Sequence, residues 1–193
     1  MNSALCQLPN ALTIARALAG PFGAVLLVQS SQASVESDAV RLGLLAALVF
    51  IAAAMTDWLD GWLARRLNSE SALGALLDPI ADKCLVGGYL IAYCAISGFD
   101  AWLVLPVLVI LGRDVAVTAL RFVRPSAGTL HVTLMAKTKT ALQMIITAAP
   151  FALIFIGFRD VAVWYHYWIG AVWFLALLTA WSAWPYYRAA LRH

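Results

Sequence analysis

The sequence predicts an all-α membrane protein in which six transmembrane helices form a single bundle. Of its 193 residues, 63% are hydrophobic and only 12% are charged, whereas a soluble domain averages roughly 25% charged residues. The mean hydropathy is +0.85. The apolar residues fall into six stretches separated by short polar segments, and each stretch can cross a hydrocarbon core about 30 Å thick as a helix. We expect residues 1–193 to form one domain.

Each expected helix is an apolar run that ends at polar or turn-forming residues. Asn10, Thr13 and Arg16 occur at helical spacing near the start of the first run, and the second run ends in a cluster of charged residues. The expected helices span residues 10–28, 40–65, 75–97, 101–122, 137–158 and 161–187. The expected connections are a polar linker at 29–39, turns at 66–73, 97–100 and 159–160, and a loop or surface segment at 123–136.

The distribution of basic residues predicts the orientation in the membrane. Six spans place both chain ends on one side. Of the 13 basic residues, 11 fall on that side and 2 on the other, and the side richer in Lys and Arg normally faces the cytoplasm. The larger group is Arg16, Arg65, Arg66, Lys83, Arg113, Arg121, Arg124, Lys137, Lys139, Arg188 and Arg192, and the smaller is Arg41 and Arg159.

Four aspartates lie within this otherwise apolar chain, on two consecutive helices. At about 100° per residue, Asp57 and Asp60 share a face of the second helix, and Asp78 and Asp82 share a face of the third. The second helix would be about 39 Å long at 1.5 Å per residue. It therefore exceeds the hydrocarbon core, and its aspartate-bearing end should reach the interface, where ions and soluble substrates have access.

These carboxylates predict a metal site. An ionised Asp at the centre of a membrane helix costs about 2.5–3.5 kcal/mol, and repulsion between neighbouring carboxylates adds to that cost. One or two divalent cations would offset both terms, and carboxylate oxygens are ligands that Mg²⁺ and Mn²⁺ prefer. Asp78 alone could instead be a helix N-cap, but that alternative does not explain Asp82.

The cations of the fourth and fifth helices suggest a phosphate site. Arg113 and Arg121 lie within the fourth helix, and Lys137 and Lys139 stand at the start of the fifth. Arginine suits bidentate phosphate contacts. The alternative is a basic fringe that contacts anionic lipid head groups, an interpretation that we keep open, above all for Lys139, Arg124 and Arg188.

The stretch 57–82 resembles the signature of the CDP-alcohol phosphatidyltransferase family. That signature runs D-x2-D-G-x2-A-R-x8-G-x3-D-x3-D, and the chain matches all eight specified positions: Asp57, Asp60, Gly61, Ala64, Arg65, Gly74, Asp78 and Asp82. Flanking segments extend the resemblance to the bacterial members that use glycerol 3-phosphate. They are LPN-x2-T-x2-R at 8–16, LDP-x-ADK at 77–83, RD-x6-LR near 113–121 and K-x-KT-x2-Q-M at 137–144.

The resemblance implies transfer of a phosphatidyl group from CDP-diacylglycerol to sn-glycerol 3-phosphate, with release of CMP. It implies that the four aspartates hold Mg²⁺ or Mn²⁺ and that Asp82 is also the general base. The CDP site would comprise Gly61, Ala64, Arg65 and Gly74. The acceptor phosphate would be bound by Arg113, Arg121, Lys137 and Lys139.

Other functions remain open at this stage. A cardiolipin synthase of the same family would use phosphatidylglycerol as the acceptor, and a more distant member would use an inositol. A cation transporter is the alternative that is not an enzyme, although transport sites tend to lie near the bilayer midplane. We expect membrane lipids but no nucleic acid as partners, and the family resemblance implies a homodimer in the bacterial inner membrane. Small residues for close helix packing, within or between chains, are Gly20, Gly23, Gly87 and Gly88.

Overall fold

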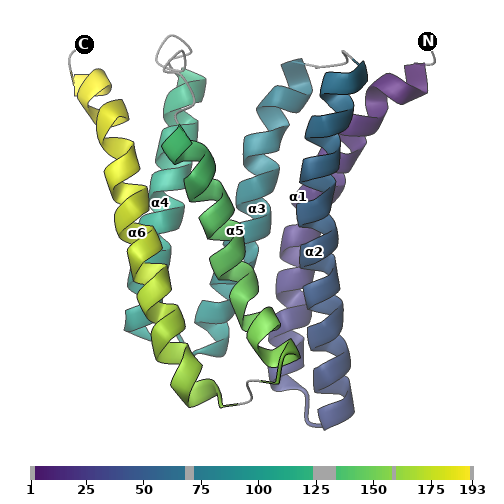
Figure 1. The fold of residues 1–193 in the computed structure, drawn as a ribbon, viewed down its shortest axis with the longest axis vertical. Helices are drawn as coiled ribbons and strands as arrows, with labels where there is room; N and C mark the ends of the chain where they lie inside the picture. Colours follow the sequence, from purple (N-terminus) through teal and green to yellow (C-terminus); the bar gives the residue numbers. More distant parts are fainter. Residues whose placement is uncertain (1–2, 68–71, 124–133, 158–159, 192–193) are drawn as a thin grey trace. The chain divides into compact units, whose positions relative to one another are not determined.

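In the computed structural model, every described secondary-structure element is a helix (Figure 1). It describes residues 3–67, 72–123, 134–157 and 160–191, with the side chains of residues 11–56, 79–119, 138–157 and 160–182. The described residues form six helices and no strand. The helices are α1 (Ser3–Gln32), α2 (Glu36–Leu67), α3 (Ala72–Ile96), α4 (Ala101–Val123), α5 (Leu134–Phe155) and α6 (Val161–Leu191).

All six helices are long and apolar enough to cross a membrane, which confirms the predicted fold class. Several helices run further than the hydropathy indicates. The expected linker 29–39 is wrong in extent, because α1 continues to Gln32 and α2 already begins at Glu36. A helix can continue past the hydrocarbon core, since water satisfies its polar side chains there. The Ser30 hydroxyl also donates to the Ala39 carbonyl at 2.7 Å and ties the two helix ends together.

The chain divides into two compact units, residues 1–96 and 97–193. In the first unit, α1 packs against both α2 and α3. The contact with α3 is a close backbone approach. A Cβ atom added to Gly20 would lie 2.3 Å from the Cys84 carbonyl oxygen, and one added to Gly88 would lie 3.0 Å from the Gly20 carbonyl oxygen. Only glycine permits the separation at Gly20, and any larger residue would be tight at Gly88, so the predicted role of both in helix packing is confirmed within one chain.

Tyr89 joins the three helices of this unit. Its hydroxyl donates to the Ala46 carbonyl of α2 at 2.6 Å, and its ring packs edge-on against Phe50 with centroids 5.0 Å apart. The same hydroxyl fills the space beside Gly23 of α1, where an added Cβ would lie only 1.8 Å away. The buried residues of α2 on this side are Ala46, Phe50 and Ala53, and positions 57 and 60 continue their spacing along the helix.

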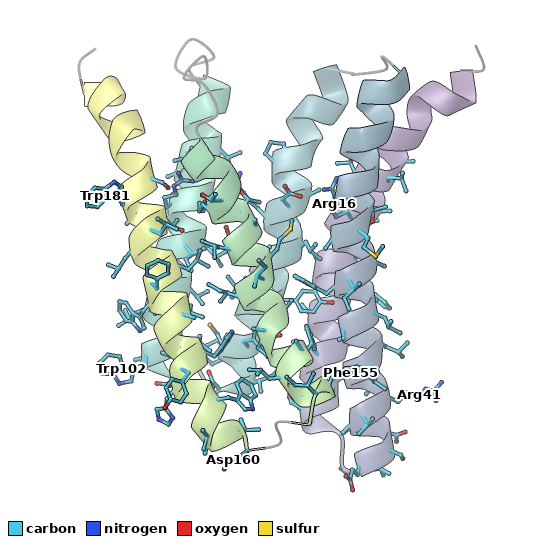
Figure 2. The ribbon with its side chains drawn as sticks, viewed as in Figure 1. Arg16, Arg41, Trp102, Phe155, Asp160 and Trp181 are labelled. Atoms are coloured by element: carbon cyan, nitrogen blue, oxygen red, sulfur yellow. The ribbon has the colours of Figure 1, made fainter. Side chains whose placement is uncertain are left out.

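In the second unit, α6 packs against α4 and α5. Two indole groups of α6 donate to backbone carbonyls: Trp168 to Ile146 at 2.8 Å and Trp173 to Trp102 at 2.9 Å. Trp102 and Trp181 project away from their helices (Figure 2) and are 69% and 76% exposed. Large apolar side chains also remain exposed on both units, as expected where lipid replaces water. Examples are Leu18, Leu48, Leu108, Phe174 and Leu177.

Candidate active site

The four aspartates of the signature lie on the two helix ends that adjoin residues 68–71. Asp57 and Asp60 lie in the last three turns of α2, and Asp78 and Asp82 lie in the first half of α3. Gly61, Ala64 and Arg65 belong to α2, and Gly74 belongs to α3. Of these eight residues, only Asp82 has a side chain among those described. Asp78 lies well inside α3, which begins at Ala72, so the alternative of an N-cap at Asp78 is wrong.

Asp82 forms an ion pair with Arg16 of α1. The Arg16 Nη1 atom donates to Asp82 Oδ1 at 2.9 Å, and the exposed fractions of the two side chains are 0% and 26%. Figure 2 shows Arg16 directed into the first unit. From the sequence, Arg16 is expected near the start of the first helix, with no role in the site. The sequence does contain a signal for such a role, because a charged residue inside an apolar span is by default a candidate functional residue.

The local sequence of α1 explains how an arginine is held there. Thr13 and Arg16 are 2% and 1% exposed, whereas their neighbours Ile14 and Leu18 are 50% and 68% exposed. The buried positions 13, 16, 20 and 23 recur every three or four residues and therefore form one helix face. This face packs against α3, so Thr13 and Arg16 point into the protein, and Ile14 and Leu18 point outward.

The chemistry of the aspartates fits a hard divalent cation, because all four supply carboxylate oxygens. Asp82 is partly exposed, which is consistent with access to ions and substrate. Among the side chains that the structure describes, no three Asp, Glu, His or Cys residues gather at one point. Asp57, Asp60 and Asp78 lie outside that set, so the predicted ligand group remains a prediction.

A second polar group lies in the other unit and centres on Asp114 of α4, which is 4% exposed. Arg113 Nη1 donates to Asp114 Oδ1 at 3.1 Å, and Lys139 Nζ of α5 donates to the same oxygen at short range. Gln143 Nε2 donates to Asp114 Oδ2 at 3.3 Å. Arg113 Nη2 also donates to Ser182 Oγ of α6 at 2.9 Å. We call these five residues the Asp114 cluster.

Among the described side chains, the Asp114 cluster holds two cations and one carboxylate. Arg113 Nε is buried and makes no hydrogen bond within the described part of the chain. A buried donor atom without a partner is poorly solvated, and a bound anion would satisfy it. The cluster is therefore suited to an anionic ligand.

The structure brings together two of the four predicted acceptor residues, Arg113 and Lys139. The side chains of Arg121 in α4 and Lys137 in α5 lie outside the described set. Lys139 is 5% exposed, so the interpretation of Lys139 as part of an exposed basic fringe is wrong. Sequence reasoning missed Asp114 as the common acceptor, although an acidic residue inside an apolar helix is itself a signal of function.

Comparison with known proteins identifies the family of the chain. The sequence model of the CDP-alcohol phosphatidyltransferase family matches residues 6–181, which includes both units. The chain is 35% identical to a protein of Cereibacter sphaeroides over 222 residues, covering 96% of each. It is 35% identical to a protein of Bacillus subtilis over 192 residues, covering 94% of this chain and 93% of the relative.

A protein of Escherichia coli K12 is 38% identical over 151 residues, covering 75% of this chain and 78% of the relative. All three relatives are named CDP-diacylglycerol–glycerol-3-phosphate 3-phosphatidyltransferase. Members of the family generally depend on a divalent metal ion. The predictions of an enzyme and of its family are thus confirmed, and the transporter alternative falls. The chain belongs to the CDP-alcohol phosphatidyltransferase family.

Proposed function

We propose that the protein transfers the phosphatidyl group of CDP-diacylglycerol to sn-glycerol 3-phosphate, giving phosphatidylglycerol phosphate and CMP. One observation carries this proposal: relatives named for this reaction match the chain over nearly its whole length. Their names favour glycerol 3-phosphate over the phosphatidylglycerol that a cardiolipin synthase would use. The two cations of the Asp114 cluster support an acceptor that carries a phosphate.

In the proposed reaction, a hydroxyl oxygen of the acceptor attacks the phosphorus atom that carries the diacylglycerol. A new phosphorus–oxygen bond forms, the pyrophosphate bridge breaks, and CMP leaves. Asp82 takes the proton of the attacking hydroxyl as the general base. Gly61, Ala64, Arg65 and Gly74 would line the CDP site, where small residues allow the nucleotide to approach the helix closely.

Asp57, Asp60, Asp78 and Asp82 would hold one or two Mg²⁺ or Mn²⁺ ions, which neutralise charge on the pyrophosphate when bound. Arg113, Arg121, Lys137 and Lys139 would bind the acceptor phosphate. Arg113 and Lys139 already share Asp114, which would restrain both cations before the acceptor arrives and lower the entropic cost of binding.

We further propose that the two units act as one domain in the bacterial cytoplasmic membrane, with the site facing the cytoplasm. The excess of basic residues on the aspartate side supports this orientation. The homodimer implied by the family resemblance is part of the same proposal.

A direct assay of the acceptor tests this function. Purified protein in detergent would receive CDP-diacylglycerol, Mg²⁺ or Mn²⁺, and either glycerol 3-phosphate or phosphatidylglycerol, and CMP and the lipid product would be followed. We expect turnover with glycerol 3-phosphate alone. Turnover with phosphatidylglycerol alone would overturn the acceptor assignment and leave the aspartate chemistry in place.

A further inference from the structure

Among the side chains described in the first unit, Arg16 is the most deeply buried charged one, and it lies beside the predicted catalytic aspartate. It belongs to the apolar span Ala11–Gln32, its side chain is 0% exposed, and it donates to Asp82 Oδ1 at 2.9 Å. A guanidinium buried in a membrane span is expensive unless an anion pairs with it. The pairing with Asp82 meets that requirement and connects α1 to the residue expected to take the proton.

The backbone around this ion pair leaves little freedom for it to shift. Gly20 lies one turn after Arg16, and a Cβ atom there would meet the Cys84 carbonyl oxygen at 2.3 Å and the Leu85 Cα at 2.7 Å. Cys84 lies two residues after Asp82. The two helices are therefore in backbone contact within about one turn of the ion pair, and their relative register determines where the guanidinium meets the carboxylate.

Arginine is well suited to holding a carboxylate in one orientation. Its planar, permanently charged group presents several donors in a fixed geometry, whereas lysine presents a flexible point charge. Thr13 is also buried on the same face of α1. The face of α1 that contacts α3 is therefore polar at Thr13 and Arg16, and one turn later it carries the small residue Gly20.

From this geometry we propose that Arg16 is a positioning residue for Asp82: it holds the carboxylate in the orientation that accepts the hydroxyl proton. The inference rests on the proposed function, because it assigns a purpose to the orientation of Asp82 during transfer. Arg16 would act through Asp82 and would not bind the donor pyrophosphate itself.

The experiment compares Arg16→Gln and Arg16→Lys with the wild-type enzyme, and uses Arg41→Gln as a matched control. Arg41 is exposed and projects away from α2 (Figure 2). We expect Arg16→Gln to lower kcat by about 100-fold, the typical effect of a misplacement near 1 Å. We expect KM for both substrates and the Kd for CDP-diacylglycerol to change less than about threefold. Arg16→Lys should recover part of kcat, and Arg41→Gln should have no effect.

A double-mutant cycle with Asp82→Asn separates positioning from a general structural role. If Arg16 acts through Asp82, Arg16→Gln should reduce kcat no further in the Asp82→Asn background. The melting temperature of the metal-free protein gives a second readout that does not depend on activity. Arg16→Gln should lower this melting temperature less in the Asp82→Asn background than in the wild-type background.

Three results would overturn the proposal: a multiplicative loss of kcat in the double variant, a rise of more than about tenfold in the Kd for CDP-diacylglycerol, or an unchanged kcat in folded Arg16→Gln. If Arg16→Gln does not fold, Arg16→Lys decides the question by the same criteria. Failure of the proposed function would look different, since the wild-type enzyme would then fail with glycerol 3-phosphate. The Arg16 cycle would in that case be run with the acceptor that the wild type does use.

Discussion

Lys139 of α5 donates to Asp114 of α4, and the exposed fractions of the two side chains are 6% and 5%. The residues are 25 positions apart in the sequence, so this buried ion pair exists only because the helices of the second unit fold together. The same carboxylate also accepts from Arg113 and Gln143. Asp114 is thus the common acceptor for donors on two helices.

We predict that Asp114→Ala destabilises the protein strongly. The substitution leaves the buried Lys139 and the half-buried Arg113 without their carboxylate, and breaking a buried ion pair typically costs about 3–5 kcal/mol. Thermal unfolding in detergent measures the effect. Asp38→Ala is the control, because Asp38 is exposed. An equal loss of stability in the two variants would contradict the prediction.

Gly20→Ala should also reduce stability, because the new methyl group would meet the Cys84 carbonyl oxygen at 2.3 Å. The helices must then separate, and overpacking of this kind typically costs about 1–3 kcal/mol. Gly170→Ala is the matched control: no atom lies within 4 Å of a Cβ added there, and alanine is the better helix former. We expect the melting temperature to fall for Gly20→Ala alone, and a fall of the same size in both would show that the close contact is unimportant.

Removal of divalent metal should abolish turnover, and Mg²⁺ or Mn²⁺ should restore it. We expect Asp78→Asn to raise the metal concentration for half-maximal turnover by more than about tenfold, since even the outer partners of metal ligands contribute 10–100-fold. Titration of CMP release against metal concentration gives this value. Asp38→Asn is the control, because Asp38 lies in the first turn of α2. It should require the same metal concentration for half-maximal turnover as the wild type does. Full turnover in excess chelator would exclude the metal site.

Arg121→Ala should raise the KM for glycerol 3-phosphate by about tenfold or more, the equivalent of one charge-assisted hydrogen bond. The KM for CDP-diacylglycerol should change little, because Arg121 is assigned to the acceptor alone. Steady-state kinetics with each substrate varied in turn measures both constants, with Arg41→Ala as the control. Equal increases in the two KM values would count against an acceptor pocket that includes Arg121.

Much of the fold was predictable because membrane helices are local structures. Hydropathy and length identify all six spans. They also assign Asp57 and Asp60 to one helix and Asp78 and Asp82 to the next, as the structure has them. Helix ends were less predictable. Between Gln32 and Glu36 the chain leaves the helix for only a few residues, because polar side chains near the interface are compatible with both a helix and a loop.

The sequence by itself determined the six helices and the family signature, and it predicts a divalent cation as the ligand of the four carboxylates. Only the tertiary structure decided which polar groups meet: Arg16 with Asp82 across 66 positions, and Lys139 with Asp114. The physical reason is that lipid is as apolar as the protein interior. Hydrophobicity therefore does not distinguish the exposed Leu18 from the buried Leu85, and the partners of a buried charge are set by which helix faces pack together.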